Sequence, residues 1–169
     1  MRRVIVAYFR AGKGSEFPPL NAYATIRFWV GKPPVGGQKG TVMLYNVLII
    51  EDDRRTADSL AAQVGVLGHT VAVAYGPRMA LRQLSQVIPD VILLDINMPG
   101  LNGLEVLRFL RRDPPTATVP VIVITANDSR EMRLAARNAG ATFYLVKPPM
   151  LDEIEGALDR AVSLNPPPH

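Results

Sequence analysis

Residues 91–104 read VILLDINMPGLNGL. Four apolar residues lead into one acid, Asp95, and a loop with proline and glycine follows before a helical pattern begins. A short apolar run between turn residues is typical of a strand buried on both faces, as in parallel sheets covered by helices. Open α/β sheets bind ligands at the carboxyl ends of their strands, where Asp95 is expected. A structural role as a helix N-cap or loop acid also remains open for Asp95.

Strand and helix patterns alternate five times from residue 45 onward. We predict strands over 46–50, 70–74, 91–95, 119–125 and 142–146, and helices over 55–67, 77–88, 103–112, 129–139 and 151–163. In the second helix, Leu81, Leu84 and Ile88 are predicted to share one face. This alternation predicts an α/β fold with a doubly wound, five-stranded parallel sheet. Because the crossovers are right-handed, all five carboxyl ends would meet at one edge.

Length, charge and composition exclude several classes of protein. A chain of 169 residues is long enough for one domain with a full core, and the absence of cysteine excludes disulfides and thiolate metal sites. Residues 1–44 carry seven basic side chains and one acid, whereas residues 45–169 carry twelve basic and fourteen acidic ones. The basic character therefore belongs to the first segment, so we expect no direct nucleic-acid binding. No apolar run approaches the roughly 20 residues of a membrane span.

The first segment, residues 1–44, differs in composition from the rest. It contains six glycines and four prolines, and the stretch GKPPVGGQKG is typical of a linker. Residues 4–8 and 25–30 could each form a short strand. Because Met43 is a second possible start, we interpret this leader as disordered or untranslated, with a basic docking or membrane-surface arm as the alternative. The domain then spans residues 45–164, and residues 165–169 form a proline-rich tail.

The predicted carboxyl edge of the sheet gathers polar residues. They are Glu51, Asp52, Asp53, Asp95, Asn97, Thr125, Asn127 and Lys147. Carboxylates brought together need a cation, and oxygen ligands without Cys or His favour a hard ion such as Mg²⁺. A lysine and a hydroxyl beside an aspartate suit phosphoryl transfer, in which Asp can be the covalent nucleophile. No histidine is expected in this pocket, so Asp95 is the predicted acceptor.

Each of these residues also has a structural explanation. Lys147 could be a surface lysine at a strand end, and Thr125 a β-branched strand residue. Residues 51–53 could cap the first helix and interact with its dipole. Their coincidence at a single edge favours a functional site.

Taken together, the segments VLIIEDD, VILLDINMPGLNGLEVL, VIVITA and YLVKP resemble the receiver domain of bacterial two-component response regulators, over about residues 45–164. The resemblance implies a flavodoxin-like (βα)5 receiver fold and a cytoplasmic signalling protein. It implies that Asp95 accepts a phosphoryl group, with Mg²⁺, from a sensor histidine kinase or histidine phosphotransfer protein. Such a domain is no enzyme in the usual sense, because it catalyses only its own phosphoryl transfer and dephosphorylation.

The resemblance also implies the ligands of the metal. Glu51 and Asp52 match the acidic pair, with Asp52 the more direct ligand, and Asp95 and the backbone carbonyl of Asn97 complete the set. Lys147 would pair with the phosphoryl group, or with Asp95 when that residue is unmodified.

Further positions match the family's switch. Thr125 would hydrogen-bond the phosphoryl oxygen, and Tyr144 would turn inward as Thr125 moves. The surface of the fourth helix, fifth strand and fifth helix would then change shape for a downstream protein. Asn97 and Asn127 match the positions that tune dephosphorylation, and the bond before Pro148 is expected to be cis.

The departures from the family pattern are few. Asp53 adds a third acid, so the choice of the acidic pair depends on register, and Pro149 stands where an apolar residue, often Phe, follows the Lys-Pro. No effector domain follows, so we expect a stand-alone, chemotaxis-receiver-like protein. Two alternatives are a pseudo-receiver that binds partners without phosphorylation and a Mg²⁺-dependent aspartyl phosphatase of the haloacid-dehalogenase type. That phosphatase family has an Asp where this chain has Asn97, and its nucleophile strand comes first.

Overall fold

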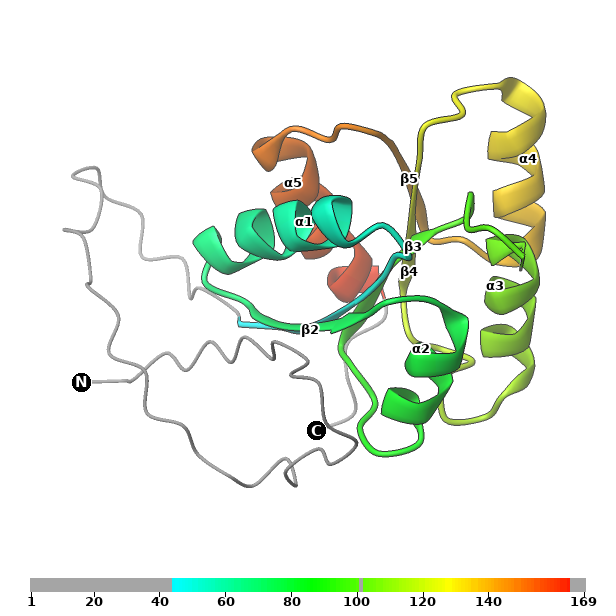
Figure 1. Cartoon of the computed structure of the whole chain (residues 1–169), viewed down its shortest axis with the longest axis horizontal. Helices are drawn as coiled ribbons and strands as arrows, with labels where there is room; N and C mark the ends of the chain where they lie inside the picture. The colour runs from blue at the N-terminus through cyan, green and yellow to red at the C-terminus, as the bar shows by residue number, and fades with distance from the viewer. Residues whose placement is uncertain (1–43, 101, 165–169) are drawn as a thin grey trace, which may run out of the picture.

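The structure is a computed structural model that describes residues 44–100 and 102–164, in which strands and helices alternate (Figure 1). The elements are β1 (Asn46–Ile50), α1 (Arg54–Val66), β2 (Thr70–Ala74), α2 (Pro77–Leu84), β3 (Val91–Asp95), α3 (Gly103–Arg112), β4 (Val121–Thr125), α4 (Arg130–Ala139), β5 (Phe143–Val146) and α5 (Leu151–Leu164). The strands suggested at residues 4–8 and 25–30 lie outside the described residues. Among the described helices, none has the length and hydrophobicity of a membrane span.

The five strands form one parallel sheet in the order β2-β1-β3-β4-β5. The prediction of a doubly wound parallel sheet is therefore confirmed. Strand order reverses between β1 and β3, because the chain first moves outward to β2 and then returns past β1. This reversal places the carboxyl ends of β1 and β3 side by side, where such sheets leave a crevice for ligands.

Helices cover both faces of the sheet. Helices α1 and α5 lie on one face, and α2, α3 and α4 lie on the other (Figure 1). Along β3, Ile92 and Leu94 pack toward the second group of helices, whereas Val91 and Leu93 pack toward α1 and α5. All five β3 residues are buried, which explains the continuous apolar run in the sequence.

Helix α3 begins close to the end of β3. The Asn102 side chain accepts a hydrogen bond from the Leu104 amide at 2.9 Å and caps the helix, while the Gly103 amide donates to the Ile96 carbonyl at 3.2 Å. A Cβ at Gly103 would lie 2.4 Å from Ile96 Cα and 2.5 Å from the Asp95 carbonyl oxygen. Only glycine permits this approach, which fixes the backbone beneath Asp95.

The predicted extent of the second helix is wrong at its carboxyl end. Helix α2 ends at Leu84, so Ile88 lies beyond it, and both Leu81 and Ile88 are exposed. Pro89 keeps Ile88 out of the helix, because a proline disfavours helical geometry in the residue before it.

Candidate functional site

Four strand ends supply the site at the carboxyl edge of the sheet. Glu51 and Asp52 follow β1, Asp95 ends β3, Thr125 ends β4 and Lys147 follows β5. Parallel register brings these ends together, since Asp95 pairs with Ile124 in β4 and Thr125 pairs with Val146 in β5. The structure thus gathers at one edge residues that are up to 96 positions apart in the chain.

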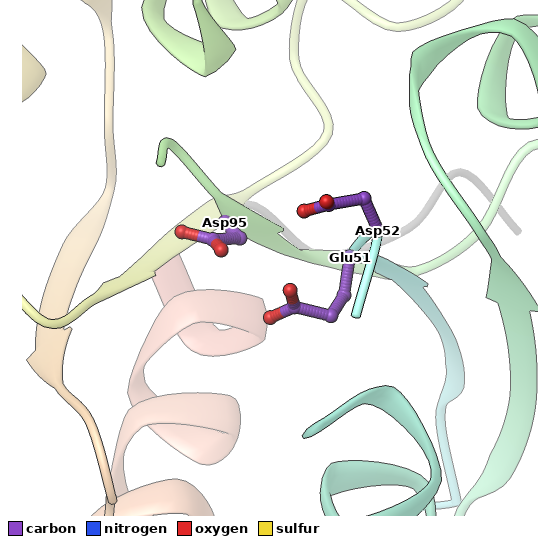
Figure 2. Close-up of side chains that lie close together, drawn as sticks. All are labelled: Glu51, Asp52 and Asp95. Carbon is purple, nitrogen blue, oxygen red and sulfur yellow. The ribbon is translucent and has the colours of Figure 1, made fainter. Parts of the chain in front are cut away.

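Three carboxylates form a cluster at this edge. Figure 2 shows Glu51 and Asp52 extending from the end of β1 toward Asp95, and one oxygen from each of the three lies within 4.8 Å of the others. Glu51 and Asp95 are buried, with 1% and 5% of their surface exposed, whereas Asp52 is more open to solvent. Burial raises the pKa of Glu51 above its ordinary value.

Asp53, the third acid, belongs to helix α1 rather than to the carboxylate cluster. Its side chain accepts hydrogen bonds from the Thr56 amide and hydroxyl, both at 2.8 Å, and caps the helix. These bonds lower the pKa of Asp53. The structural explanation therefore holds for Asp53, and the register leaves Glu51 and Asp52 as the pair beside Asp95.

Lys147 joins the carboxylates of β1 and β3. Its Nζ donates to Asp95 Oδ2 at 2.7 Å and also to Glu51. Burial alone would lower the pKa of Lys147, but the hydrogen bonds to Asp95 and Glu51 outweigh it and raise the pKa. The ammonium group is therefore held as a cation, and the bond from Lys147 to Pro148 is cis, as the resemblance implied.

Thr125 is fully buried, and its hydroxyl is held by two asparagines. Oγ1 accepts a hydrogen bond from Asn97 Nδ2 at 2.6 Å and another from the Asn127 amide at 3.2 Å. The backbone amide of Asn97 donates to Asp95 Oδ1 at 2.8 Å. Both oxygens of Asp95 are therefore engaged, Oδ1 by Asn97 and Oδ2 by Lys147.

Tyr144 lies half-buried on β5 and contacts the loop that follows β4. Its hydroxyl donates to the Asn127 carbonyl, and the Arg133 guanidinium lies 4.8 Å from the centre of its ring. Arg133 also pairs with Asp128 in the same loop. Tyr144 is thus linked to Thr125 through Asn127, which contacts both.

Two features of this site escape the sequence-based prediction. Nothing in the chain marks Arg133 as the partner of Tyr144, because surface arginines on helices are common. The contact from Asn97 to Thr125 joins residues 28 positions apart and depends on the conformation of the loop after β3. The only sequence signal was their placement at the same sheet edge.

The residues present suit a divalent cation. Glu51, Asp52 and Asp95 bring three carboxylates together, and Lys147 supplies one positive charge near them. The donor set contains oxygen atoms only, which is the preference of Mg²⁺.

Comparisons with known proteins agree on the family. The family model described as the response regulator receiver domain matches residues 47–159. The chain belongs to the response regulator receiver family. It is 39% identical over 112 residues to "Response regulator MprA" of Mycobacterium ulcerans, an alignment that covers 66% of this chain and 47% of the relative. The chain thus spans about half the length of the curated relatives it matches.

Solved receiver structures have the same fold. A chemotaxis protein of Vibrio cholerae, CheY4, superposes with a TM-score of 0.67 at 27% identity, covering 70% of this chain and 99% of that one. The receiver domain of a sensor histidine kinase from Pseudomonas aeruginosa PAO1 gives 0.66 at 28% identity, covering 72% of this chain and 99% of that one. That structure is described with a magnesium ion coordinated in its active site cleft. The predicted receiver fold is therefore confirmed.

Proposed function

We propose that this receiver domain is the phosphoacceptor of a two-component phosphorelay and that Asp95 receives the phosphoryl group. The surroundings of Asp95 carry the proposal. The carboxylate is buried at the end of β3, lies beside Glu51 and Asp52, and has one oxygen 2.7 Å from the Lys147 ammonium nitrogen. A buried aspartate with a fixed cation and two further carboxylates suits phosphoryl transfer better than a purely structural role.

In this mechanism the Asp95 carboxylate attacks the phosphorus of a phosphohistidine on a sensor histidine kinase or a phosphotransfer protein. The new O–P bond forms as the N–P bond breaks, and the imidazole leaves. Lys147 neutralises charge on the transferring oxygens, because its ammonium group already faces Asp95. Thr125 donates its hydroxyl hydrogen to one of the same oxygens.

Glu51, Asp52, Asp95 and the backbone carbonyl of Asn97 would hold Mg²⁺. When bound, the ion supplies positive charge that offsets the repulsion between the carboxylates and the phosphoryl oxygens. The three clustered carboxylates support this assignment, as does the magnesium named for the receiver domain from Pseudomonas aeruginosa.

The output of the switch is a change in protein binding. Thr125 and Tyr144 both hydrogen-bond Asn127, so a movement of Thr125 toward the phosphoryl group would shift Asn127 and change its contact with Tyr144. We place the partner surface on α4, β5 and α5 and the protein in the cytoplasm, with no direct nucleic-acid contact by this domain. The asparagines Asn97 and Asn127 would tune dephosphorylation from the rim of the site.

Intact mass spectrometry tests the proposal. The full chain is incubated with acetyl phosphate, with and without Mg²⁺, beside the Asp95→Asn variant. We expect one phosphoryl group on the wild type with Mg²⁺ and none on the variant. Labelling that persists undiminished in Asp95→Asn would exclude Asp95 as the acceptor. A wild type that gains nothing from acetyl phosphate or from a purified histidine kinase would favour the pseudo-receiver.

A further inference from the structure

The Thr125 hydroxyl oxygen is covered before any phosphoryl group arrives, although its hydrogen remains available to donate. A hydroxyl oxygen has two acceptor positions, and those of Thr125 are taken by Asn97 Nδ2 at 2.6 Å and by the Asn127 amide at 3.2 Å. None of the Thr125 surface is exposed. A phosphoryl oxygen must come within about 3 Å of this hydroxyl to bond with it. One of the groups that cover Thr125 therefore has to move.

Asn97 is the group that can move without a change in the fold. Its side chain is exposed and belongs to the loop directly after Asp95, so a rotation about its side-chain bonds carries the amide into solvent. The other donor is a backbone amide, and its residue is tied at two further points. The Asn127 carbonyl accepts from Tyr144, and Asn127 Oδ1 accepts from the Ser129 amide at 2.9 Å.

We propose that the Asn97 side chain is a latch on Thr125. In the unphosphorylated domain its side-chain amide donates to the Thr125 hydroxyl oxygen and holds it in place. On activation this neutral hydrogen bond breaks as Asn97 moves aside, and the Thr125 hydroxyl donates its own hydrogen to a phosphoryl oxygen. The exchange is favourable because hydrogen bonds to charged oxygens are about twice as strong as neutral ones. The inference rests on the proposed function and adds a positioning role for Asn97 that is separate from its backbone carbonyl.

The first test needs neither metal nor phosphoryl group. Side-chain coupling constants measured by NMR on the full chain report the rotamer of Thr125. In the wild type we expect a single rotamer, and in Asn97→Ala an average over several. Asn127→Ala is the matched control, because it removes an asparagine side chain from the same edge but leaves the backbone amide that contacts Thr125. A single, unchanged rotamer in Asn97→Ala would overturn the latch.

The second test measures the exchange itself. Beryllofluoride with Mg²⁺ serves as a non-covalent substitute for the phosphoryl group, and its affinity is measured by NMR titration. We expect Asn97→Ala to bind it about 2- to 10-fold more tightly, the range for loss of one neutral hydrogen bond in the free state. In a Thr125→Val background the same substitution should have no effect, because the latch has nothing to hold.

The outcomes distinguish failure of the Asn97 latch from failure of the proposed phosphoacceptor function. If the wild type binds beryllofluoride but Asn97→Ala binds it equally or more weakly, the latch is wrong and Asn97 supports Thr125 instead. An equal gain in affinity in the Thr125→Val background would also overturn the latch, since the effect would not pass through Thr125. If the wild type neither binds beryllofluoride nor accepts a phosphoryl group, the proposed function itself fails.

Discussion

The ammonium nitrogen of Lys147 lies 2.7 Å from Asp95 Oδ2 and also hydrogen-bonds Glu51, so a single cation from β5 joins the carboxylates of β3 and β1. Asp52 lies close to both of these carboxylates. When all four groups are ionised, the cluster keeps an excess of two negative charges. Lysine therefore holds the site together, and a divalent cation would complete its neutralisation.

We predict that Lys147→Met lowers the stability of the metal-free protein and strengthens Mg²⁺ binding. The substitution leaves two buried carboxylates without their cation, which costs about 3 kcal/mol, the low end of the range for buried pairs. The carboxylates freed from the lysine then attract Mg²⁺ more strongly. Urea unfolding with and without Mg²⁺ measures both effects, and Lys147→Arg, which keeps the charge, is the control. Equal Mg²⁺ affinity in Lys147→Met and wild type would contradict the prediction.

We predict that Gly103→Ala destabilises the domain by about 1–3 kcal/mol and slows phosphorylation of Asp95. The added Cβ would meet the Ile96 and Asp95 backbone at 2.4 and 2.5 Å, so α3 or the end of β3 must shift. The matched control is Gly156→Ala in α5, where the nearest atom, at 3.1 Å, ends the flexible Arg160 side chain. We expect this control to be neutral or stabilising, because alanine favours helix. Two equally stable variants in urea would rule out the steric argument.

Much of the fold can be predicted from the sequence, because continuous apolar runs mark the strands that are buried on both faces. Residues 91–95 and 121–125 are apolar up to a final polar residue, and both strands are buried along their whole length. The sequence predicts a longer α2 than the structure has, because Ile88 continues the apolar spacing. Pro89 keeps Ile88 out of helical geometry, so the apolar spacing overestimates the length of α2.

The sequence predicts which residues lie at the site but not which hydrogen bonds they form with one another. Strand order and register place Glu51, Asp95, Thr125 and Lys147 at one edge, and spacing along the chain is enough to expect this. Which acid caps a helix, as Asp53 does, and which side chain covers Thr125 depend on loop geometry. Such contacts involve one or two hydrogen bonds and produce no repeating pattern of residues from which they could be predicted.

We predict that Tyr144→Ala leaves phosphorylation close to normal but weakens the response of the α4–β5–α5 surface. Tyr144 forms no hydrogen bond with Asp95 or Lys147, but its hydroxyl donates to the Asn127 carbonyl in the loop after β4. The change in amide chemical shifts on α5 upon addition of beryllofluoride and Mg²⁺ measures this response. We expect the shifts to shrink in Tyr144→Ala.

The chain offers a matched control for that substitution. Tyr75 also carries an arginine over its ring, with Arg54 at 4.7 Å, and its hydroxyl donates to Asp58 at 3.1 Å. It follows β2, at the opposite end of the sheet from β5. Tyr75→Ala should therefore leave the α5 shifts unchanged. A full response in Tyr144→Ala, or an equal loss in both variants, would remove Tyr144 from the switch.

We predict that stability falls as the pH drops below about 6.5, the ordinary pKa of histidine, because of His69. The side chain is buried, its Nδ1 accepts a hydrogen bond from the Tyr45 amide at 3.4 Å, and its ring stacks on the Tyr45 ring. Burial lowers the pKa of His69, although Asp159 and Glu155 act in the opposite direction. The folded state therefore resists a proton that the unfolded state accepts.

The lowered pKa of His69 in the folded state makes the protein less stable in acid. Well above pH 6.5, His69 is neutral in both the folded and the unfolded protein, so the stability that depends on the neutral side chain is fully present. As the pH falls below about 6.5, the unfolded protein takes up a proton at His69, and the free energy of unfolding falls by up to about 1.4 kcal/mol per pH unit until the pKa of the folded protein is reached. Urea unfolding from pH 5 to 8 measures the slope. His69→Asn, whose Oδ1 can accept from the Tyr45 amide but does not titrate, should lose this component, while His169 contributes equally to both proteins. Parallel curves for the two proteins would mean that His69 remains free to take up a proton in the folded state.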